Sequence, residues 1–575
     1  MGIASMATYL GFGTTSHDSA IAVLNEAGQL LFAEANERVL KNKRAWNTSP
    51  DPVLFLDGIL KKYVNDGPIV AGLSWSDDIL KWSWLTKKIL NLQASFHARF
   101  SQLGQQMETH SFRQAMYGAP INNRDMLLNL EYRLFEMKKL QNLKKIGWEH
   151  HLCHAATACY SSPFDNAICV IVDGAGEATS QAIFSFENAK IERIKTKSFA
   201  DFASLGLFYA AVCWACGFDP LAGEEWKVMG LAPYGKMQSE YENLCRSLLK
   251  IKNQSIQKSP RYAEQLTKLL SLREKFRSPL EAANLAFAGQ AIFEELMCEL
   301  LVQVHSKWGG ANLILGGGCA LNSSCNGVLL ERTPFKNLHI SMAPGDDGNA
   351  IGSAYLSWMK DHPKQRPLNA HTAFLGSEIS TETIERAIRL GGLKAKFFSE
   401  DELIEEVSKE LSEGKLVGWV QGRAEFGPRA LGNRSILADP RKAKTKDHIN
   451  ERIKFREEFR PFAPSILDEK GPELFHNYQY SPYMERTLRF KNTEIAPAVV
   501  HCNETGRVQS VRKEDNPRFY ALLNSFYKKT KVPVLLNTSF NVMGRPIIHD
   551  VEDALAVFFT SGLDMLVLGQ YVFKK

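Results

Sequence analysis

Two histidines set four positions apart are the residues whose types and spacing most directly suggest chemistry. They are His150 and His154, in the segment 148–156, which reads Trp-Glu-His-His-Leu-Cys-His-Ala-Ala. We predict that this segment is helical, so that both imidazoles lie on one helix face and can bind one cation. Asp173, after a predicted buried strand, and Asp346, in a second acidic loop, complete a set of two nitrogen and two oxygen donors. Such a set suits iron, manganese or zinc, and donor type alone does not choose among them.

Two neighbouring residues refine this interpretation. A zinc protease carries glutamate directly after the first histidine of the pair, and this chain has His151 there, so peptide hydrolysis is disfavoured. Asp347 follows Asp346 in the same loop, and the sequence leaves open which of the two is the ligand. A histidine pair on a helix also occurs as ordinary core or surface residues. The acidic partners at strand ends are what favours a metal site.

Basic residues gather in the last third of the chain, interleaved with glycine, proline and aromatic residues rather than forming one charge run. They are Arg429, Lys454, Arg456, Arg460, Arg507 and Arg512. Arginine offers a planar fork to phosphate and carboxylate, and lysine offers a point charge. A cluster of this kind can hold two anions close together and lower the barrier to phosphoryl or nucleotidyl transfer. The alternative is ordinary salt bridging with Glu425, Glu457 and Glu458.

A glycine-rich loop supplies a third candidate feature. The predicted strand 312–315 ends in Gly316, Gly317 and Gly318, and a helical run begins at about Ala320. This arrangement turns backbone N–H groups and a helix N-terminus toward a phosphate. The alternative is a purely structural turn.

Two similar sets of three predicted strands would position these residues. Strands are predicted at 8–13, 20–24 and 29–35, and again at 167–172, 180–186 and 191–196, with a polar or acidic loop after the first strand of each set. We therefore predict a duplicated α/β lobe in which two loops face each other across a cleft. The segment 75–145, which we predict to be helical, and the lysine-rich segment 240–280 look like insertions into this lobe. A proline-containing linker at 360–380 places a domain boundary at about residue 370.

Length and composition bound the function. The chain has 575 residues, of which 45% are hydrophobic and 23% charged, and its net charge is +6. This composition excludes disorder as the main state. It also disfavours a protein that coats nucleic acid, so we expect no nucleic-acid partner.

Cysteine usage and hydropathy indicate the compartment. The ten cysteines have no disulfide-framework spacing, and no signal peptide opens the chain, so we expect a cytoplasmic protein. The longest uncharged run, 202–218, contains Gly206 and barely reaches spanning length. We predict a buried helix there, with Cys213 and Cys216 as small apolar side chains, and no membrane association.

Several motifs together resemble one family. They are the His-His-Leu-Cys-His segment, Asp-Gly-Ala-Gly-Glu at 173–177, Glu-Trp-Lys-Val-Met-Gly-Leu-Ala-Pro-Tyr-Gly at 225–235, Gly-Gly-Gly-Cys-Ala-Leu-Asn at 316–322, Glu-Phe-Gly-Pro-Arg-Ala-Leu-Gly-Asn-Arg-Ser at 425–435, Arg-Pro-Phe-Ala-Pro-Ser at 460–465 and Asn-Thr-Ser-Phe-Asn at 537–541. In combination they resemble the O-carbamoyltransferases of antibiotic, nodulation-factor and toxin biosynthesis. The resemblance runs from about residue 8 to the C-terminus.

The resemblance implies two domains and a reaction. Residues 1–370 would form a duplicated actin-like (ASKHA) domain with a metal site, usually iron, and residues 371–575 a YrdC-like α/β domain. The second domain would bind ATP, with Mg²⁺, and carbamoyl phosphate, and would form carbamoyl-adenylate with release of pyrophosphate. The first would transfer the carbamoyl group to a hydroxyl of a small natural product, leaving AMP. We expect a small-molecule alcohol as partner and a monomer or homodimer.

The resemblance also implies roles for individual residues. Arg429, Lys454, Arg460 and Arg507 match the carbamoyl phosphate and nucleotide pocket, with Gly316, Gly317 and Gly318 as further cofactor-binding candidates; Asn537 and Ser539 match the adenylate-contacting strand end; His150, His154, Asp173 and Asp346 match the metal ligands; His17 matches the transfer-site histidine, and Lys43 a basic residue close by. We hypothesise that His17 orients or deprotonates the acceptor hydroxyl.

Two other functions stay open at this stage. Both domains also resemble the machinery of tRNA threonylcarbamoyl transfer, against which the modest net charge and the fused order stand. An actin-like ATP-binding sensor would leave the basic cluster without a role. The acceptor is not encoded legibly, although the 75–145 segment, with Trp75, Trp82 and Trp84, is a candidate for shaping its pocket, and Asp77 and Asp78 are candidates for binding a cationic acceptor.

Overall fold

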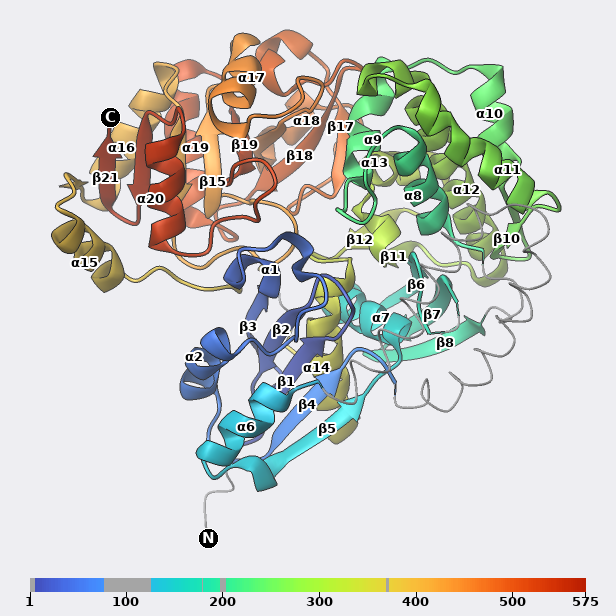
Figure 1. Cartoon of the computed structure of the whole chain (residues 1–575), viewed down its shortest axis with the longest axis horizontal. Helices are drawn as coiled ribbons and strands as arrows, with labels where there is room; N and C mark the ends of the chain where they lie inside the picture. Colours follow the sequence, from blue (N-terminus) through green and yellow to red (C-terminus); the bar gives the residue numbers. More distant parts are fainter. Residues whose placement is uncertain (1–5, 77–125, 178, 197–202, 369–371) are drawn as a thin grey trace. The chain divides into compact units, whose positions relative to one another are not determined.

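The computed structural model describes residues 6–76, 126–177, 179–196, 203–368 and 372–575. The chain forms two compact units (Figure 1). Unit 1 comprises Met1–Glu37 and Arg44–Ala370, and unit 2 comprises Arg38–Lys43 and His371–Lys575. The short segment Arg38–Lys43 therefore belongs to unit 2 although both of its neighbours in sequence belong to unit 1.

The first half of unit 1 is built on a five-stranded sheet with the order β3-β2-β1-β4-β5. Its strands are β1 (Thr8–Gly13), β2 (Ala20–Leu24), β3 (Leu30–Ala35), β4 (Ile69–Leu73) and β5 (Leu143–Gly147). The first three strands pair antiparallel, and β4 and β5 run parallel to β1. The predicted strands 8–13, 20–24 and 29–35 are thereby confirmed to within one residue.

The second half repeats this plan. Its strands are β6 (Asn166–Val172), β7 (Gln181–Glu187), β8 (Lys190–Thr196), β11 (Asn312–Gly316) and β12 (Asn337–Ile340), in the order β12-β11-β6-β7-β8. Again three strands pair antiparallel, and two more run parallel to the first. The same topology in both halves confirms the predicted duplication and the α/β class.

Two helices join the halves. α7 (His150–Tyr160) and α14 (Asn349–Asp361) pack against each other, and α14 also packs on β1, β2 and β4 (Figure 1). Glycine makes this approach possible, because a Cβ at Gly11 would lie 1.9 Å from the carbonyl oxygen of Ala350. A Cβ at Gly352 would lie 2.0 Å from the carbonyl oxygen of Cys153. The backbones of β1, α14 and α7 are thus in direct contact, which fixes where the residues at the start of each helix lie.

The remaining helices of unit 1 surround the sheets. They are α2 (Val53–Tyr63), α6 (Leu128–Glu136), α8 (Leu205–Ala215), α9 (Glu225–Leu231), α10 (Ser239–Arg246), α11 (Tyr262–Ser271), α12 (Ala283–Trp308) and α13 (Ser323–Arg332). The predicted buried helix at 202–218 corresponds to α8, and Cys213 and Cys216 are buried and unpaired. Within the described ranges no helix is long and apolar enough to cross a membrane.

Two insertions differ from their predicted form. The helical prediction for 75–145 is wrong at its end, because 143–147 is the edge strand β5, whose two exposed lysines hide the strand pattern. Residues 77–125, including Trp82, Trp84, Asp77 and Asp78, lie outside the described part of the chain. The 240–280 segment contains a hairpin of β9 (Leu249–Lys252) and β10 (Ser255–Lys258) between its helices.

Unit 2 is a nine-stranded mixed sheet with the order β13-β21-β20-β14-β15-β19-β16-β18-β17. The strands are β13 (Lys396–Phe397), β14 (Val417–Val420), β15 (Arg434–Ala438), β16 (Ala463–Leu467), β17 (Arg486–Arg489), β18 (Thr505–Val511), β19 (Val534–Ser539), β20 (Met565–Leu568) and β21 (Tyr571–Lys574). Alternate residues of β19 enter different cores, Leu535 on one face and Val534 with Leu536 on the other. Both faces are therefore buried.

Helices cover both faces of this sheet. They are α15 (Thr381–Gly391), α16 (Glu400–Ser412), α17 (Lys444–Ile449), α18 (Gly471–Leu474), α19 (Pro517–Thr530) and α20 (Val551–Thr560). α16 packs on α19 over one core, whereas α20 contributes to the other.

The close packing at Gly11 gives a stability prediction. Gly11→Ala places a methyl group against the α14 backbone and should lower the free energy of unfolding of unit 1 by about 2 kcal/mol. Gly58→Ala, at an exposed position of α2 with no atom within 4 Å, is the matched control and should raise stability by about 0.5–1 kcal/mol. Urea unfolding of the full chain measures both. Equal unfolding midpoints for the two variants would contradict the close contact.

Candidate functional site

The four predicted metal ligands come together in unit 1. His150 and His154 lie on α7, Asp173 follows β6, and Asp346 begins the short helical turn Asp346–Gly348 before α14. Their donor atoms all lie within 4.8 Å of one another. The Nε2 atoms of the two histidines are 3.2 Å apart, and each lies 3.3–3.7 Å from Asp173 Oδ2 and Asp346 Oδ1. Asp346, and not Asp347, supplies the fourth donor among the described residues.

These separations fit one bound cation. Bonds of about 2.0–2.2 Å to nitrogen and oxygen place tetrahedral donors about 3.4 Å apart, close to the measured spacings. The four side chains are at most 13% exposed. The two Nε2 atoms face each other in a buried site beside the two carboxylates, so a cation placed between them could be bound by all four donors.

The electrostatics of the four groups agree with this fit. Burial disfavours the imidazolium form, yet Asp173 and Asp346 outweigh it and raise the pKa of His150 to about 10. The same carboxylates raise the pKa of His154 against the effect of burial. In turn the two histidines hold the pKa of Asp173 well below its ordinary value despite burial. The carboxylate pair thus attracts positive charge to this point.

Surrounding residues hold the ligands in place. The backbone N–H of Gly318 donates to Asp173 Oδ1 at 2.9 Å, which leaves Oδ2 directed at the histidines. Asn349 Nδ2 lies 3.2 Å from His154 Nε2 and 3.4 Å from His150 Nδ1. The indole of Trp75 stacks on the His150 ring, with centroids 4.5 Å apart. Such outer contacts fix ring orientation and tune affinity for a cation.

The glycine loop supports a ligand residue of the donor set. Gly318 uses its N–H on Asp173, and Gly317 has a φ of 84° that brings it against the backbone of Val172. The helix after the loop begins at Ser323 rather than at about Ala320, with Asn322 accepting from the Cys325 N–H. In the structure the loop positions a carboxylate; phosphate binding by Gly316, Gly317 and Gly318 stays a prediction.

His17 lies beside the donor set, in the loop between β1 and β2. Its Nδ1 is 3.7 Å from Asp346 Oδ2, 2.8 Å from Asp18 Oδ2 and 2.9 Å from Arg44 Nη2. The Trp46 ring lies edge-on to it, with centroids 4.8 Å apart. The structure therefore places Arg44 against His17, whereas Lys43 belongs to unit 2, where its charge helps to lower the pKa of Lys454.

The basic residues of unit 2 form a cluster of like charges, which we call the basic cluster: Arg429, Lys454, Arg456, Arg460 and Arg507. Burial first, and then the charges of Arg429, Arg456 and Arg460, hold the pKa of Arg507 well below its ordinary value. Burial, Arg456 and Arg460 do the same for Lys454. Burial alone lowers the pKa of Arg429 to about 10. The cations repel one another, so an anion of high charge is the ligand that fits them.

Two of the predicted binding residues, Lys454 and Asn537, form hydrogen bonds with other residues of unit 2. Lys454 Nζ donates to Asn541 Oδ1 at 2.7 Å and to Ser539 Oγ at 3.3 Å, so it is tied to the end of β19. Asn537 is 1% exposed, and its amide donates to Gln509 Oε1 and Ser465 Oγ. The structure thus places Asn537 behind the strand end as an internal support, and its contact with an adenylate stays a prediction.

A buried carboxylate shapes the loop that carries Arg429. Glu425 Oε1 accepts from the backbone N–H groups of Leu431, Asn433 and Arg434 at 2.7–3.0 Å. Arg38, from the short segment Arg38–Lys43, donates to the carbonyl oxygens of Glu425 and Gly427. Glu425 is therefore a loop organiser rather than a salt-bridge partner of the basic cluster. Glu457 does pair with Arg460, at 3.3 Å.

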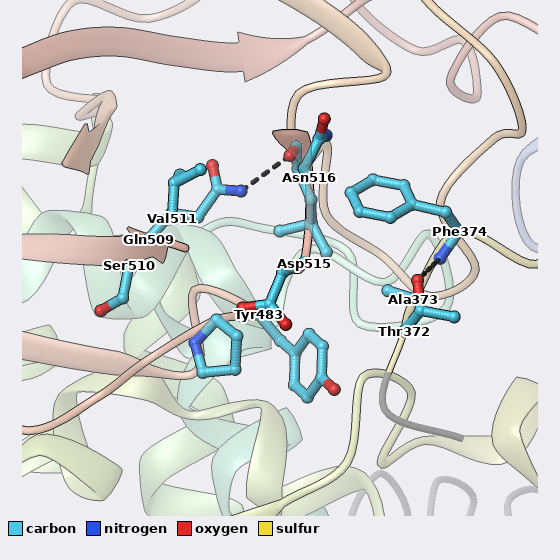
Figure 2. Close-up of a pocket in the computed structure, with 11 residues that line it drawn as sticks. Thr372, Ala373, Phe374, Tyr483, Gln509, Ser510, Val511, Asp515 and Asn516 are labelled. Atoms are coloured by element: carbon cyan, nitrogen blue, oxygen red, sulfur yellow. Dashed lines mark hydrogen bonds between the residues drawn. The ribbon is translucent and has the colours of Figure 1, made fainter. Parts of the chain in front are cut away.

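A small pocket of unit 2 lies beside the Gln509 side chain (Figure 2). Its lining includes Phe374, Tyr483 and Asp515, and Gln509 donates to the Leu431 carbonyl at 2.7 Å. No arginine or lysine lines it. The pocket therefore lacks the positive charges that define the basic cluster.

Sequence reasoning missed several residues of the unit 1 site: Asp18, Arg44, Trp46, Trp75 as a stacking residue, and Asn349. Weak signals existed, since Asp18 adjoins His17, Arg44 adjoins Lys43, and Asn349 closes the Gly-Asp-Asp-Gly-Asn run. Adjacency does not say which side chain faces the site, because that depends on backbone conformation at each residue.

The fold and the site define an α/β protein of two units. One unit holds a set of donors suited to a cation, and the other holds the basic cluster, which is suited to an anion. Residues 8–355 match the carbamoyltransferase N-terminus and residues 408–575 match the carbamoyltransferase C-terminus. This chain belongs to the carbamoyltransferase family.

Three relatives illustrate the family. An uncharacterised Synechocystis protein is 37% identical, with 74% of this chain and 76% of that protein covered. The nodulation protein NolO of Bradyrhizobium diazoefficiens is 34% identical, with 74% of this chain and 78% of that protein covered. The 3'-hydroxymethylcephem-O-carbamoyltransferase of Amycolatopsis lactamdurans is 30% identical, with 62% and 66% covered.

The donor set predicts metal binding that depends on single ligands. The full chain, equilibrated with Fe²⁺, Mn²⁺ or Zn²⁺ and then desalted, should retain metal, and His154→Ala should lower the affinity by more than about 100-fold because one of four donors is lost. Elemental analysis measures the retained metal. His448→Ala, at an exposed position of α17, is the control and should retain as much as the wild type. Equal retention by His154→Ala would contradict the assignment.

The basic cluster predicts opposite effects of one variant on stability and binding. Arg507→Met removes a buried cation from among like charges, so the ligand-free protein should gain about 1 kcal/mol, or roughly 2–4 °C in the melting temperature of unit 2. Pyrophosphate should stabilise the wild type but not this variant. Arg489→Met, on the neighbouring strand β17 with an exposed partner in Glu504, should change neither property. Undiminished stabilisation of Arg507→Met by pyrophosphate would exclude an anion site.

Proposed function

We propose that this protein is an ATP-dependent O-carbamoyltransferase that uses carbamoyl phosphate to carbamoylate a hydroxyl of a small natural product. The observation that carries the proposal is the gathering of Arg429, Arg456 and Arg460 around Arg507. Burial and these like charges hold the pKa of Arg507 well below its ordinary value, which favours a polyanionic ligand. ATP and carbamoyl phosphate are ligands of this kind. Membership of the carbamoyltransferase family, and the name of the Amycolatopsis relative, support hydroxyl carbamoylation.

In the first step unit 2, which we propose to be YrdC-like, forms carbamoyl-adenylate. Water splits carbamoyl phosphate into carbamate and phosphate, and a carbamate oxygen then attacks the α-phosphorus of ATP and displaces pyrophosphate. The fork of Arg507 and the charge of Arg429 hold the phosphate groups close together, which offsets their repulsion. Mg²⁺, which commonly binds to ATP phosphates, would accompany the nucleotide.

In the second step unit 1, which we propose to have the actin-like fold, transfers the carbamoyl group. The acceptor oxygen attacks the carbamoyl carbon, the bond to the adenylate phosphate breaks, and AMP leaves. His17 takes the acceptor proton. His150, His154, Asp173 and Asp346 would hold the cation, iron by resemblance, which when bound supplies positive charge for the leaving phosphate.

A pair of variants separates the two steps. His17→Ala should leave pyrophosphate release from ATP and carbamoyl phosphate largely intact and lower carbamate formation by about 100-fold or more, because only the transfer step loses its base. Arg429→Ala should abolish pyrophosphate release. Mass spectrometry of a panel of alcohols that includes 3'-hydroxymethylcephem detects the gain of one carbamoyl unit, and His448→Ala is the control. An equal loss of both activities in His17→Ala would refute the division of roles.

A further inference from the structure

Arg44 is the most heavily bonded side chain around His17. Its Nε and Nη2 both donate to Asp18 Oδ2, at 3.0 and 2.8 Å, and its Nη1 donates to the carbonyl oxygens of Pro220 and Leu221 at 3.3 Å. Backbone bonds add to this, since Asp18 N–H donates to the Arg44 carbonyl at 2.7 Å. Arg44 thus ties the loop after β1 to the loop before α9.

Asp18 and Arg44 both have strained backbones. Asp18 has a φ of 54° and Arg44 a φ of 62°, in the left-handed region. Such conformations cost about 1–3 kcal/mol each and persist only where the surroundings impose them. Gly223 packs against the Arg44 side chain, where a Cβ would lie 2.9 Å from Cδ. Both residues are strained, and their side chains are bonded to each other. The surrounding structure therefore stabilises the contact between Asp18 and Arg44.

Two neighbours of His17 Nδ1, Asp18 and Arg44, decide which ring nitrogen carries the proton. The acceptor nearest to Nδ1 is Asp18 Oδ2 at 2.8 Å, whereas Asp346 Oδ2 at 3.7 Å is beyond hydrogen-bond distance. Arg44 Nη2 lies 2.9 Å from Nδ1 and also donates to Asp18 Oδ2, so Nδ1 either donates to the carboxylate or accepts from the guanidinium. Within the described residues no hydrogen bond engages His17 Nε2. With its proton on Nδ1, donated to Asp18, the ring keeps its lone pair on Nε2.

We propose that Asp18 and Arg44 are positioning residues for the transfer step: the carboxylate, held by the guanidinium, keeps His17 in the tautomer whose Nε2 accepts the proton of the acceptor hydroxyl. This inference rests on the proposed function for the role of His17, although the tautomer itself does not. As the acceptor oxygen bonds to the carbamoyl carbon, its proton moves to Nε2 and AMP leaves. Asp18 then stabilises the imidazolium, as a buried carboxylate does beside a catalytic histidine.

Asp18→Asn is the sharpest test of this role. Asparagine tolerates a positive φ, so the loop should keep its backbone. Asparagine removes the negative charge that holds the proton on Nδ1, so Arg44 Nη2, 2.9 Å away, becomes the donor to Nδ1 and the ring proton moves to Nε2. Nitrogen-15 spectra of histidine-labelled full chain in mildly alkaline buffer report the tautomer, and His17→Gln identifies the His17 signals.

We expect Nδ1–H in the wild type and Nε2–H in Asp18→Asn. The kcat for carbamate formation on the best alcohol of the panel should fall by about 100-fold or more, with pyrophosphate release and the KM for carbamoyl phosphate unchanged. Arg44→Lys keeps the charge but loses the fork, so it should give a mixture of tautomers and an intermediate kcat. Asp165→Asn, on an exposed side chain paired with Arg366, is the matched control.

The outcomes separate this inference from the proposed function. Nε2–H in the wild type, or the same tautomer in wild type and Asp18→Asn, would overturn the positioning role. A tautomer that changes as expected while kcat stays constant would establish the positioning of the ring and overturn the role of His17 as base.

Discussion

The candidate site of unit 1 depends on the contacts of one carboxylate, that of Asp346. Its Oδ1 lies 3.3 Å from His154 and 3.6 Å from His150, and its Oδ2 lies 3.7 Å from His17. One side chain therefore couples the cation-type donor set to the histidine that we propose as the base. Its place is fixed by the start of α14, which rests on β1 and α7 through glycine contacts. Any shift of α14 would move both features together.

Unit 2 gathers side chains whose charges have the same sign. Unit 1 balances two carboxylates against two histidines, whereas the basic cluster holds cations whose pKa values burial and mutual repulsion lower. Such an arrangement stores free energy that a bound polyanion releases. The supports are internal: Glu425 binds backbone N–H groups, and Asn537 and Gln509 bind each other behind the strand ends.

The duplicated sheets explain how the unit 1 residues meet. The loops after β1 and β6 are equivalent in the two halves, and they carry His17 and Asp173 respectively. Helices α7 and α14 supply the remaining donors. Two copies of one simple topology therefore place loops far apart in sequence at one point, which is where open α/β sheets bind ligands. The chemistry differs between the two loops although the scaffold is the same.

The sequence by itself determined the strand repeat and the helix that bears His150 and His154, because hydrophobic periodicity and i, i+4 spacing are local properties. Only the tertiary structure decided that Asp346 rather than Asp347 joins the donors, that Arg44 contacts His17, and that Gly318 supports Asp173. In each case neighbouring residues of similar type compete for one place. The winner is set by backbone conformation and by packing against segments more than a hundred residues away, which local patterns do not encode.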